Sequence, residues 1–257
     1  MPNFHNTYKT RFSTEVMSKS DWKGLASELS SLLNLQSPPI AITFSDTAPP
    51  EVPRYEGTMP DPTVDGRTGK VPAGCVFWMK ASNQTFTTVP EDHGNCSVGS
   101  YTHGLKTARE ITGNSDVSTL LECGWVTEEM FSKIPSIKKR SNFISYGPLK
   151  DTNMDPDVVF MFINAMQSMV LHDAIPDIRI EGKPQCHIIA IAKEQREIAM
   201  SVGCMLSRVR TGMPGTEMSC AIPGERLQEV VLSLSKTRSA DNAVAAYASE
   251  DSRRFHR

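Results

Sequence analysis

Short runs of apolar residues recur along the chain, separated by polar segments rich in turn-forming residues. Runs of this length with β-branched and aromatic side chains predict strands. The predicted strands span residues 40–44, 143–149, 158–163, 198–201 and 218–223. Apolar positions spaced three or four apart between Trp22 and Leu33, after Ser20 and Asp21 as capping residues, predict a helix. The combination predicts an α+β fold, a mixed sheet flanked by helices, in a single domain over residues 1–257.

Further apolar or periodic segments complete the prediction. The runs 75–81 and 186–193 are too short for periodicity to distinguish a buried helix from a buried strand. Residues 225–235 and the alanine-rich stretch 241–249 predict two helices near the C-terminus. Residues 46–72 show no clear element, which indicates either a functional lid or an element that the pattern does not reveal.

One stretch, residues 85–99, combines a strand, a polar loop and the start of a helix. Pro90 cannot donate to a sheet ladder, so the strand should end there. Ser97 is a candidate cap for a helix that runs towards Ile111. Cys96 then lies just before the first helical turn, where backbone N–H groups favour a thiolate. His93 lies three residues earlier, so the pair is a candidate catalytic or metal-binding site.

The order of features in the first half of the chain recurs in the second half. Segments 39–44, 75–81 and 146–149 correspond to 157–162, 186–192 and 221–224, and the strand before Cys96 corresponds to the one before Cys204. This order predicts two similar halves, 37–150 and 155–237, from an internal duplication. We expect the turns at Cys96 and Cys204 to face one cleft. The remaining cysteines have apolar neighbours or no partner motif and are interpreted as core residues: Cys75, Cys123, Cys186 and Cys220.

The two halves differ in their polar residues. The first half has Glu91 and Asp92 before its cysteine turn, whereas the second half has Arg208 and Arg210 on the helix after Cys204. Arginines in this position suit an anionic ligand or a metal-bound substrate, which makes Cys204 and Arg208 candidate cofactor-binding residues. The alternative is that the arginines lie on a solvated helix face.

Charge and composition exclude several classes of protein. The net charge of −2 gives no electrostatic preference for nucleic acid, and no apolar run reaches the length of a membrane span. The N-terminal residues lack the pattern of a secretory signal, which predicts a cytoplasmic location. In that reducing compartment the six cysteines should be thiols or ligands, and the absence of a Cys-x-x-Cys pair disfavours a zinc ribbon. The expected partner is a small-molecule substrate, with self-association into a homo-oligomer as a further option.

Several of these segments together resemble one protein family. They include Pro38-Pro39-Ile40-Ala41, Gly74-Cys75-Val76-Phe77-Trp78, the stretch from Glu91 to Tyr101, Gly203-Cys204 and Ala221-Ile222-Pro223. Over nearly its whole length the chain resembles domain-of-unknown-function family 169. The resemblance implies membership and names no reaction. Relatives carry a Gly-Cys-x-Gly-x-Arg turn where this chain has Leu206 in place of the second glycine.

Three functions compete. In the first, an enzyme acts on a small molecule through a metal centre, which is iron, with haem as one form, or another thiophilic ion. Cys96 is a ligand of this metal, and His93 is a second ligand or an acid/base. In the second, Cys96 is a metal-free nucleophile, His93 is its base and Asn95 stabilises charge. In the third, the thiols of Cys96 and Cys204 sense a metal or the redox state without catalysis. No dinucleotide-binding, P-loop or nucleophile-elbow motif is present.

Overall fold

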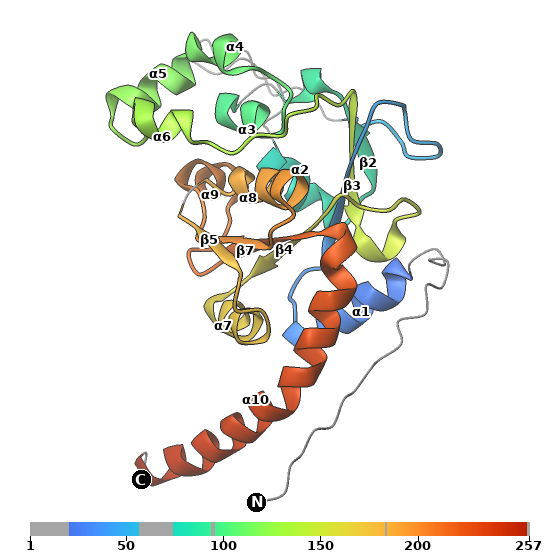
Figure 1. Ribbon diagram of the computed structural model, residues 1–257, viewed down its shortest axis with the longest axis vertical. Coiled ribbons are helices and arrows are strands. Elements are labelled where there is room, and N and C mark those ends of the chain that lie inside the picture. Colours follow the sequence, from blue (N-terminus) through green and yellow to red (C-terminus); the bar gives the residue numbers. More distant parts are fainter. Residues whose placement is uncertain (1–20, 57–73, 94–95, 183, 256–257) are drawn as a thin grey trace, which may run out of the picture.

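The structure, a computed structural model, describes residues 21–56, 74–93, 96–182 and 184–255 (Figure 1). Its strands are β1 (Ile40–Ser45), β2 (Phe86–Thr88), β3 (Phe143–Pro148), β4 (Val158–Ile163), β5 (Arg179–Glu181), β6 (Ala199–Ser201) and β7 (Met218–Pro223). Its α-helices are α1 (Trp22–Leu33), α2 (Gly74–Ala81), α3 (Ser97–Thr102), α4 (Ala108–Thr112), α5 (Ser115–Glu122), α6 (Glu128–Ser132), α7 (Ala165–Ala174), α8 (Cys186–Ala190), α9 (Met205–Thr211) and α10 (Leu227–Phe255). Short helical turns are η1 (Pro90–Asp92), η2 (Leu149–Asp151), the π-helical η3 (Ile191–Gln195) and η4 (Gly224–Arg226).

The strands form one seven-stranded mixed sheet in the order β2-β3-β1-β4-β7-β6-β5. The central pair, β1 and β4, is antiparallel, with Ile40 opposite Phe160. Strands β3 and β2 extend the sheet on the β1 side, and β7, β6 and β5 extend it on the β4 side. Strands β5 and β6 pair in parallel, and the other neighbours pair antiparallel. The predicted α+β class with a mixed sheet and flanking helices is confirmed.

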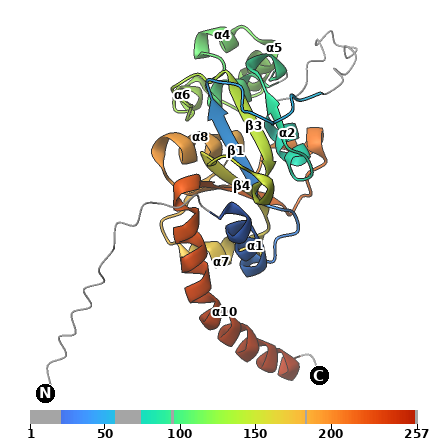
Figure 2. The same ribbon diagram turned by 90° about the vertical axis from the view of Figure 1, so that its right-hand side faces the viewer.

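Both faces of the sheet are covered, which explains the continuous apolar runs of its central strands. Along β4, alternate residues point to opposite faces: Val158, Phe160 and Phe162 belong to one core, and Val159 belongs to the other. The first core lies under α2, α3 and α8, and the second lies under α1, α7 and the start of α10 (Figures 1 and 2). In a strand that is buried on both faces, apolar and polar residues do not alternate, so its sequence is a continuous apolar run.

Two helices test the predicted boundaries. Helix α1 begins as predicted, because the Asp21 carboxylate accepts a hydrogen bond from the Gly24 N–H, and it ends at Asn34 in the left-handed conformation. The two helices predicted near the C-terminus form one helix, α10, since no Gly or Pro interrupts residues 225–255. Its first turns pack on the sheet, whereas its second half projects from the body (Figure 2).

Other predictions need correction. The helix expected from Ser97 towards Ile111 is broken, because α3 ends at Thr102 and Gly104 follows with φ +70°. The ambiguous runs 75–81 and 186–193 are both helical. Within residues 46–56 there is no helix or strand, and this part hydrogen-bonds to β2 through Tyr55 and Thr87. Residues 1–19 and most of the predicted lid, residues 57–72, lie outside the described residues.

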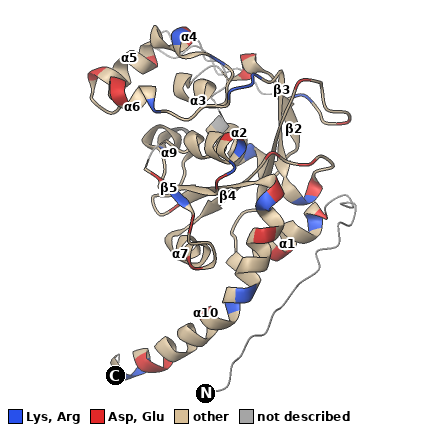
Figure 3. Ribbon diagram, viewed as in Figure 1, with Lys and Arg blue, Asp and Glu red and all other residues tan. Residues whose placement is uncertain are grey.

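Charged side chains are distributed over the surface rather than gathered. Lys and Arg alternate with Asp and Glu over the helices in Figure 3. This distribution agrees with the near-neutral net charge of −2. Across the described ranges, no helix is both long and apolar enough to cross a membrane.

Candidate functional site

A pocket opens between the helices that cover the first face of the sheet. Helix α2 packs against α9, and α3 packs against α8, so each contact joins an element before residue 150 to one after it. The pocket leaves about 30 Å³ in which the centre of a water-sized atom can lie. Its walls are Cys75, Trp78, Cys96, Val98, Gly99, Leu120, Trp125, Pro184, Gln185, Cys186, Cys204, Leu206 and Ser207.

Four of the six cysteines line this pocket, and each comes from a different element. Cys75 lies in the first turn of α2, and Cys186 is the first residue of α8. Cys96 and Cys204 occupy the residue just before α3 and α9 respectively. Cys75 and Cys96 are half-buried, whereas Cys186 and Cys204 are buried. The structure therefore brings Cys96 and Cys204 to one pocket, as the sequence predicts, and adds two more thiols.

The interpretation of the other four cysteines as core residues is only partly right. Cys186 belongs to the first core and Cys75 packs against it, as expected, and both also line the pocket, at the ends of α8 and α2. Cys123 is exposed, so it is not a core residue. Cys220 is buried against the opposite face of the sheet, as expected, and burial raises its pKa to about 12.

The electrostatics of the pocket disfavour free thiolates. Burial raises the pKa of Cys186 well above its ordinary value, and negative charge on Cys96, Cys204 or Cys75 raises it further. Among the described residues that line the pocket there is no Lys, Arg, His, Asp or Glu. No side chain in this lining therefore offsets the charge of several thiolates, whereas a bound cation would offset it.

The corner that carries Cys96 is held by a carboxylate from α5. Cys96 is the N-cap of α3, and its Sγ accepts a hydrogen bond from the Gly99 N–H at 3.4 Å. Ser97, predicted as the cap, is instead the first helical residue. Its N–H and hydroxyl both donate to Asp116, at 2.8 and 2.6 Å. A charged acceptor at the start of a helix is stabilising, so Asp116 fixes the backbone beside Cys96.

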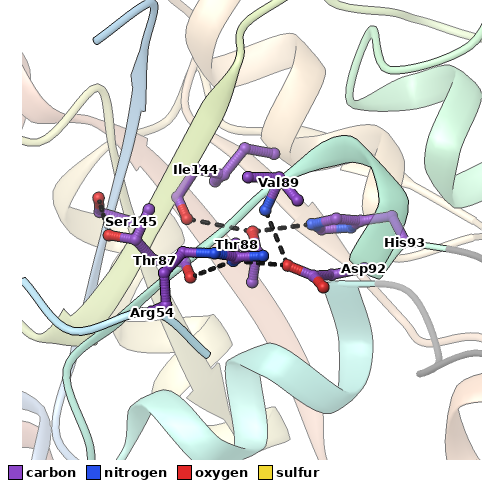
Figure 4. Close-up of polar contacts among 8 residues, drawn as sticks. All are labelled: Arg54, Thr87, Thr88, Val89, Asp92, His93, Ile144 and Ser145. Carbon is purple, nitrogen blue, oxygen red and sulfur yellow. Dashed lines mark hydrogen bonds and ion pairs between the residues drawn. The ribbon is translucent and has the colours of Figure 1, made fainter. Parts of the chain in front are cut away.

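His93 is buried beside β2 and is not among the described residues that line the pocket. Its Nε2 lies 2.9 Å from the Thr88 hydroxyl, which in turn donates to the Ile144 carbonyl at 3.1 Å (Figure 4). Because that hydroxyl proton is used on Ile144, Nε2–H of His93 must be the donor to Thr88. The Nδ1 atom has no hydrogen-bond partner in the described part of the chain.

This environment keeps His93 neutral. Burial lowers its pKa well below the ordinary value, and His103, whose ring centroid lies 6.1 Å away, lowers it further. The hydrogen bond of His93 goes to Thr88 rather than to Cys96. The pairing of His93 with Cys96 as a base and its nucleophile therefore stays a prediction.

The acidic residues expected near Cys96 are also directed elsewhere. Asp92 accepts hydrogen bonds from Arg54 at 2.7 Å and from the Val89 N–H at 2.8 Å (Figure 4). Arg54 also donates to the Thr87 carbonyl, so the pair ties residues 53–55 to β2. Gly94 and Asn95, including the predicted charge-stabilising amide, lie outside the described residues.

Arg208 braces the second corner, the turn from β6 to α9. Its guanidinium donates to the carbonyl oxygens of Val202 at 2.9 Å, Glu217 at 2.8 Å and Pro214. Gly203 lies beneath it with φ +120°, where a Cβ atom would come within 2.6 Å of the guanidinium. These bonds give Arg208 a structural role, its predicted role in binding a cofactor stays a prediction, and the side chain of Arg210 lies outside the described part.

No sequence pattern pointed to Gln185, which is the longest polar side chain in the pocket lining. It is 1% exposed, and its amide nitrogen donates to the Ser219 hydroxyl at 3.0 Å. Its Oε1 has no hydrogen-bond partner among the described residues. One sequence feature pointed to a site with more than two cysteines: Cys75 and Cys186 occupy corresponding positions at the start of similar apolar runs in the two halves.

The positions of the possible metal ligands limit which metal sites the observed conformation can form. Within the described ranges, no group of three or more His, Cys, Asp or Glu side chains is close enough to hold one metal ion. The four thiols line one pocket, and three or more of them would have to move closer together to bind one ion.

Comparisons with known proteins identify the family without naming an activity. Residues 28–232 match the family DUF169, described as "Uncharacterised ArCR". No curated protein and no solved structure matches the chain. The match covers most of the chain and includes all four pocket cysteines. The protein therefore belongs to the uncharacterised family DUF169.

Proposed function

We propose that this protein binds a thiolate-ligated metal centre in the four-cysteine pocket and uses it as an enzyme on a small molecule. The observation that carries the proposal is the convergence of four thiols, from four separate elements, on one pocket. The two remaining cysteines, Cys123 and Cys220, lie away from it.

The chemistry of the lining favours a soft cation. Thiolates bind iron, zinc and copper(I), and binding requires each thiol to lose its proton. Burial is the largest cause of the raised pKa of Cys186, and a cation would offset the smaller one, the repulsion between neighbouring thiolates. The ligands that we propose are Cys96 and Cys204 together with Cys75 and Cys186. His93 faces Thr88 and is not assigned as a ligand.

The size of the pocket favours an ion or a small cluster over haem. The volume of the pocket is about 30 Å³. A cavity needs roughly 10–15 Å³ to hold one water molecule. A porphyrin would have to displace the helices that line the pocket. We therefore propose iron or another thiophilic metal without a porphyrin ring.

A metal-free nucleophile is less well supported. A reactive cysteine usually has a low pKa from nearby positive charge. The described lining has no charged side chain, and His93, the predicted base, donates its Nε2–H to Thr88. The third possibility, a redox or metal sensor, uses the same thiols. An assay of enzymatic activity distinguishes it from an enzyme.

We also infer that the two halves arose by duplication. Cys96 and Cys204 both precede a helix, and Gly104 and Gly212, eight residues later, have φ +70° and +68°. After β3 the Leu149 N–H bonds to the Pro39 carbonyl, and after β7 the Gly224 N–H bonds to the Asp157 carbonyl. These paired features support an origin of the four-thiol pocket from two copies of a two-thiol unit.

The proposal is tested by elemental analysis of protein purified without oxygen, with activity assayed on small-molecule panels before and after metal removal. We expect bound metal in the wild type and loss of metal in Cys96→Ala and Cys204→Ala. Cys123→Ala is the matched control and should keep its metal, because Cys123 is exposed and outside the pocket. A metal-free protein with unchanged activity would refute the proposal, and metal without any activity would favour a sensor.

A further inference from the structure

We infer that a second cavity, which we call the charged cavity, binds a small zwitterion of the class of a free amino acid. The charged cavity lies at the end of β1 and is lined by Phe44, Ser45, Asp46, Lys139, Ser141, Lys193, Glu194 and Arg196. None of these residues lines the four-cysteine pocket. The inference therefore goes beyond the proposed function and does not depend on a metal.

The volume of the charged cavity is the first argument. It measures about 350 Å³, whereas the four-cysteine pocket measures about 30 Å³. Cavities that bind small organic molecules have volumes of roughly 300–1,000 Å³. The charged cavity is at the lower end of this range, so it has room for a small organic molecule.

An unusual helical turn forms one wall of the charged cavity. Helix α8 continues without a break into the π-helical turn η3, so Cys186 lies at the start of this segment and Lys193 and Glu194 lie near its end. Arg196 follows with φ +59°, a left-handed conformation that is unfavourable for a residue with a Cβ atom. Turns of the π-helical type are rare and are frequently found at functional sites, as are costly backbone conformations. Here they bring three charged side chains to one cavity.

Two cations form the positive side of the charged cavity. Lys193 is fixed in place, with 18% of its side chain exposed and its Nζ 2.6 Å from the Asp157 carboxylate. The Nζ also lies 5.0 Å from the centroid of the Phe44 ring, and the Phe44 N–H donates to Asp157 at 2.7 Å. An ammonium group has three N–H donors, so the bond to Asp157 leaves two for the carboxylate of a ligand. Arg196 is a second, exposed cation, which pairs with Glu225.

Carboxylates form the negative side. Glu194 lines the charged cavity and makes no ion pair with the described residues. Asp46 also lines it and pairs with Lys139 at 2.5 Å. Because the lining carries both signs, a ligand with a single charge would meet like charge on one side. A zwitterion satisfies both sides, with its amino group towards Glu194 and its carboxylate towards Lys193.

The test is isothermal titration calorimetry of the full chain with the common amino acids as probes. We expect at least one of them to bind with a dissociation constant in the millimolar range or below. The amide of that amino acid lacks the negative charge, and the N-acetyl derivative lacks the positive charge. Each should bind at least about tenfold more weakly, because each loses a hydrogen bond between charged groups.

Variants assign the two charges of the ligand to the two sides of the charged cavity. Glu194→Gln should weaken binding of the amino acid about tenfold, to the affinity of its N-acetyl derivative. Lys193→Gln should weaken it to the affinity of the amide. Lys133→Gln and Glu129→Gln are matched controls, because these residues form an exposed ion pair outside the lining of the charged cavity. Neither control should change the affinity.

A further variant covers the case in which Lys193→Gln does not fold, since Lys193 also holds Asp157. Arg196→Gln alters an exposed cation and should weaken binding of the amino acid by about two- to fivefold.

The outcomes separate this inference from the proposed function. The inference is wrong if no amino acid binds, or if the amide and the N-acetyl derivative bind as tightly as the amino acid. Unchanged affinity in Glu194→Gln and Arg196→Gln, or an equal loss in the two controls, would overturn the location. Amino-acid binding by a protein that never holds metal would refute the proposed function alone. Bound metal without amino-acid binding would refute this inference alone.

Discussion

Two corners of the molecule, β2 to α3 and β6 to α9, present a sulfur to the same pocket and are supported in different ways. Each consists of a buried three-residue strand, a cysteine before a short helix, and a left-handed glycine that follows the cysteine by eight residues. The first corner is held by Asp116, which comes from α5. The second is held by Arg208 from its own helix. The supports differ while the positions of Cys96 and Cys204 correspond, which indicates that the placement of sulfur is the common feature.

The first prediction is that acid destabilises the first corner. In the sequence, His93 lies three residues before Cys96 and His103 lies seven residues after it. The corresponding positions around Cys204 are Ser201 and Thr211, which do not titrate. Burial lowers the pKa of His103 from 6.5 to about 4, so the unfolded chain binds more protons between these values. The contribution of neutral His103 to the free energy of unfolding is fully present above pH 6.5 and is lost as the pH falls towards 4. The loss is on the order of 3 kcal/mol.

Urea unfolding between pH 7 and pH 4 measures this loss. His103→Gln should show a smaller decrease over the same range, because it removes one of the groups that bind a proton on unfolding. Hydrogen exchange should place the acid-sensitive opening in α3 rather than in α9. An equal loss of stability in the variant and the wild type would contradict the assignment.

The second prediction concerns the brace of the second corner. Arg208→Gln should lower the free energy of unfolding by about 2–3 kcal/mol, because it leaves backbone carbonyls of the 202–217 loop without their charged donor. Arg253→Gln, on the exposed end of α10, should change stability by less than about 0.5 kcal/mol. A fully stable Arg208→Gln variant that loses only ligand affinity would return Arg208 to a cofactor-binding role.

The third prediction compares the two left-handed glycines. An added methyl group at Gly104 would lie 2.5 Å from the Ile137 carbonyl oxygen, whereas at Gly212 nothing lies within 4 Å. Gly212→Ala should therefore cost only the backbone term of about 1–2 kcal/mol. Gly104→Ala should cost more, by about 1–3 kcal/mol for the displaced neighbour. Equal destabilisation of the two variants in urea unfolding would show that the corners are packed alike.

The sequence predicts the central strands well and the site less well, for physical reasons. Strand β4 is buried on both faces, so all of its residues are apolar and the sequence predicts it directly. Strand β5 has exposed and polar residues, and it exists through its pairing with β6, which no local pattern reveals. The core positions of Cys75 and Cys186 follow from their apolar neighbours, whereas the pocket that both side chains also line depends on contacts with α9 and α3 that no local pattern reveals.

The position of His93 depends on contacts that are distant in sequence. Its partner Thr88 is nearby, but the tautomer is fixed by the Ile144 carbonyl, 56 residues after Thr88. The role of Arg208 depends likewise on the loop that returns to it at Pro214 and Glu217. Proximity of His93 to Cys96 in the sequence therefore could not show that the His93 ring bonds to Thr88.

The most direct test of the central claim is the alkylation rate of each cysteine, measured by mass spectrometry in the metal-loaded protein and after metal removal. We expect metal removal to speed the alkylation of Cys75 and Cys96, which are half-buried, and to a lesser extent that of Cys186 and Cys204. Cys123 should react at the same rate in both states. Equal rates for Cys75 and Cys96 with and without metal would contradict the account, because these thiols would then hold no metal.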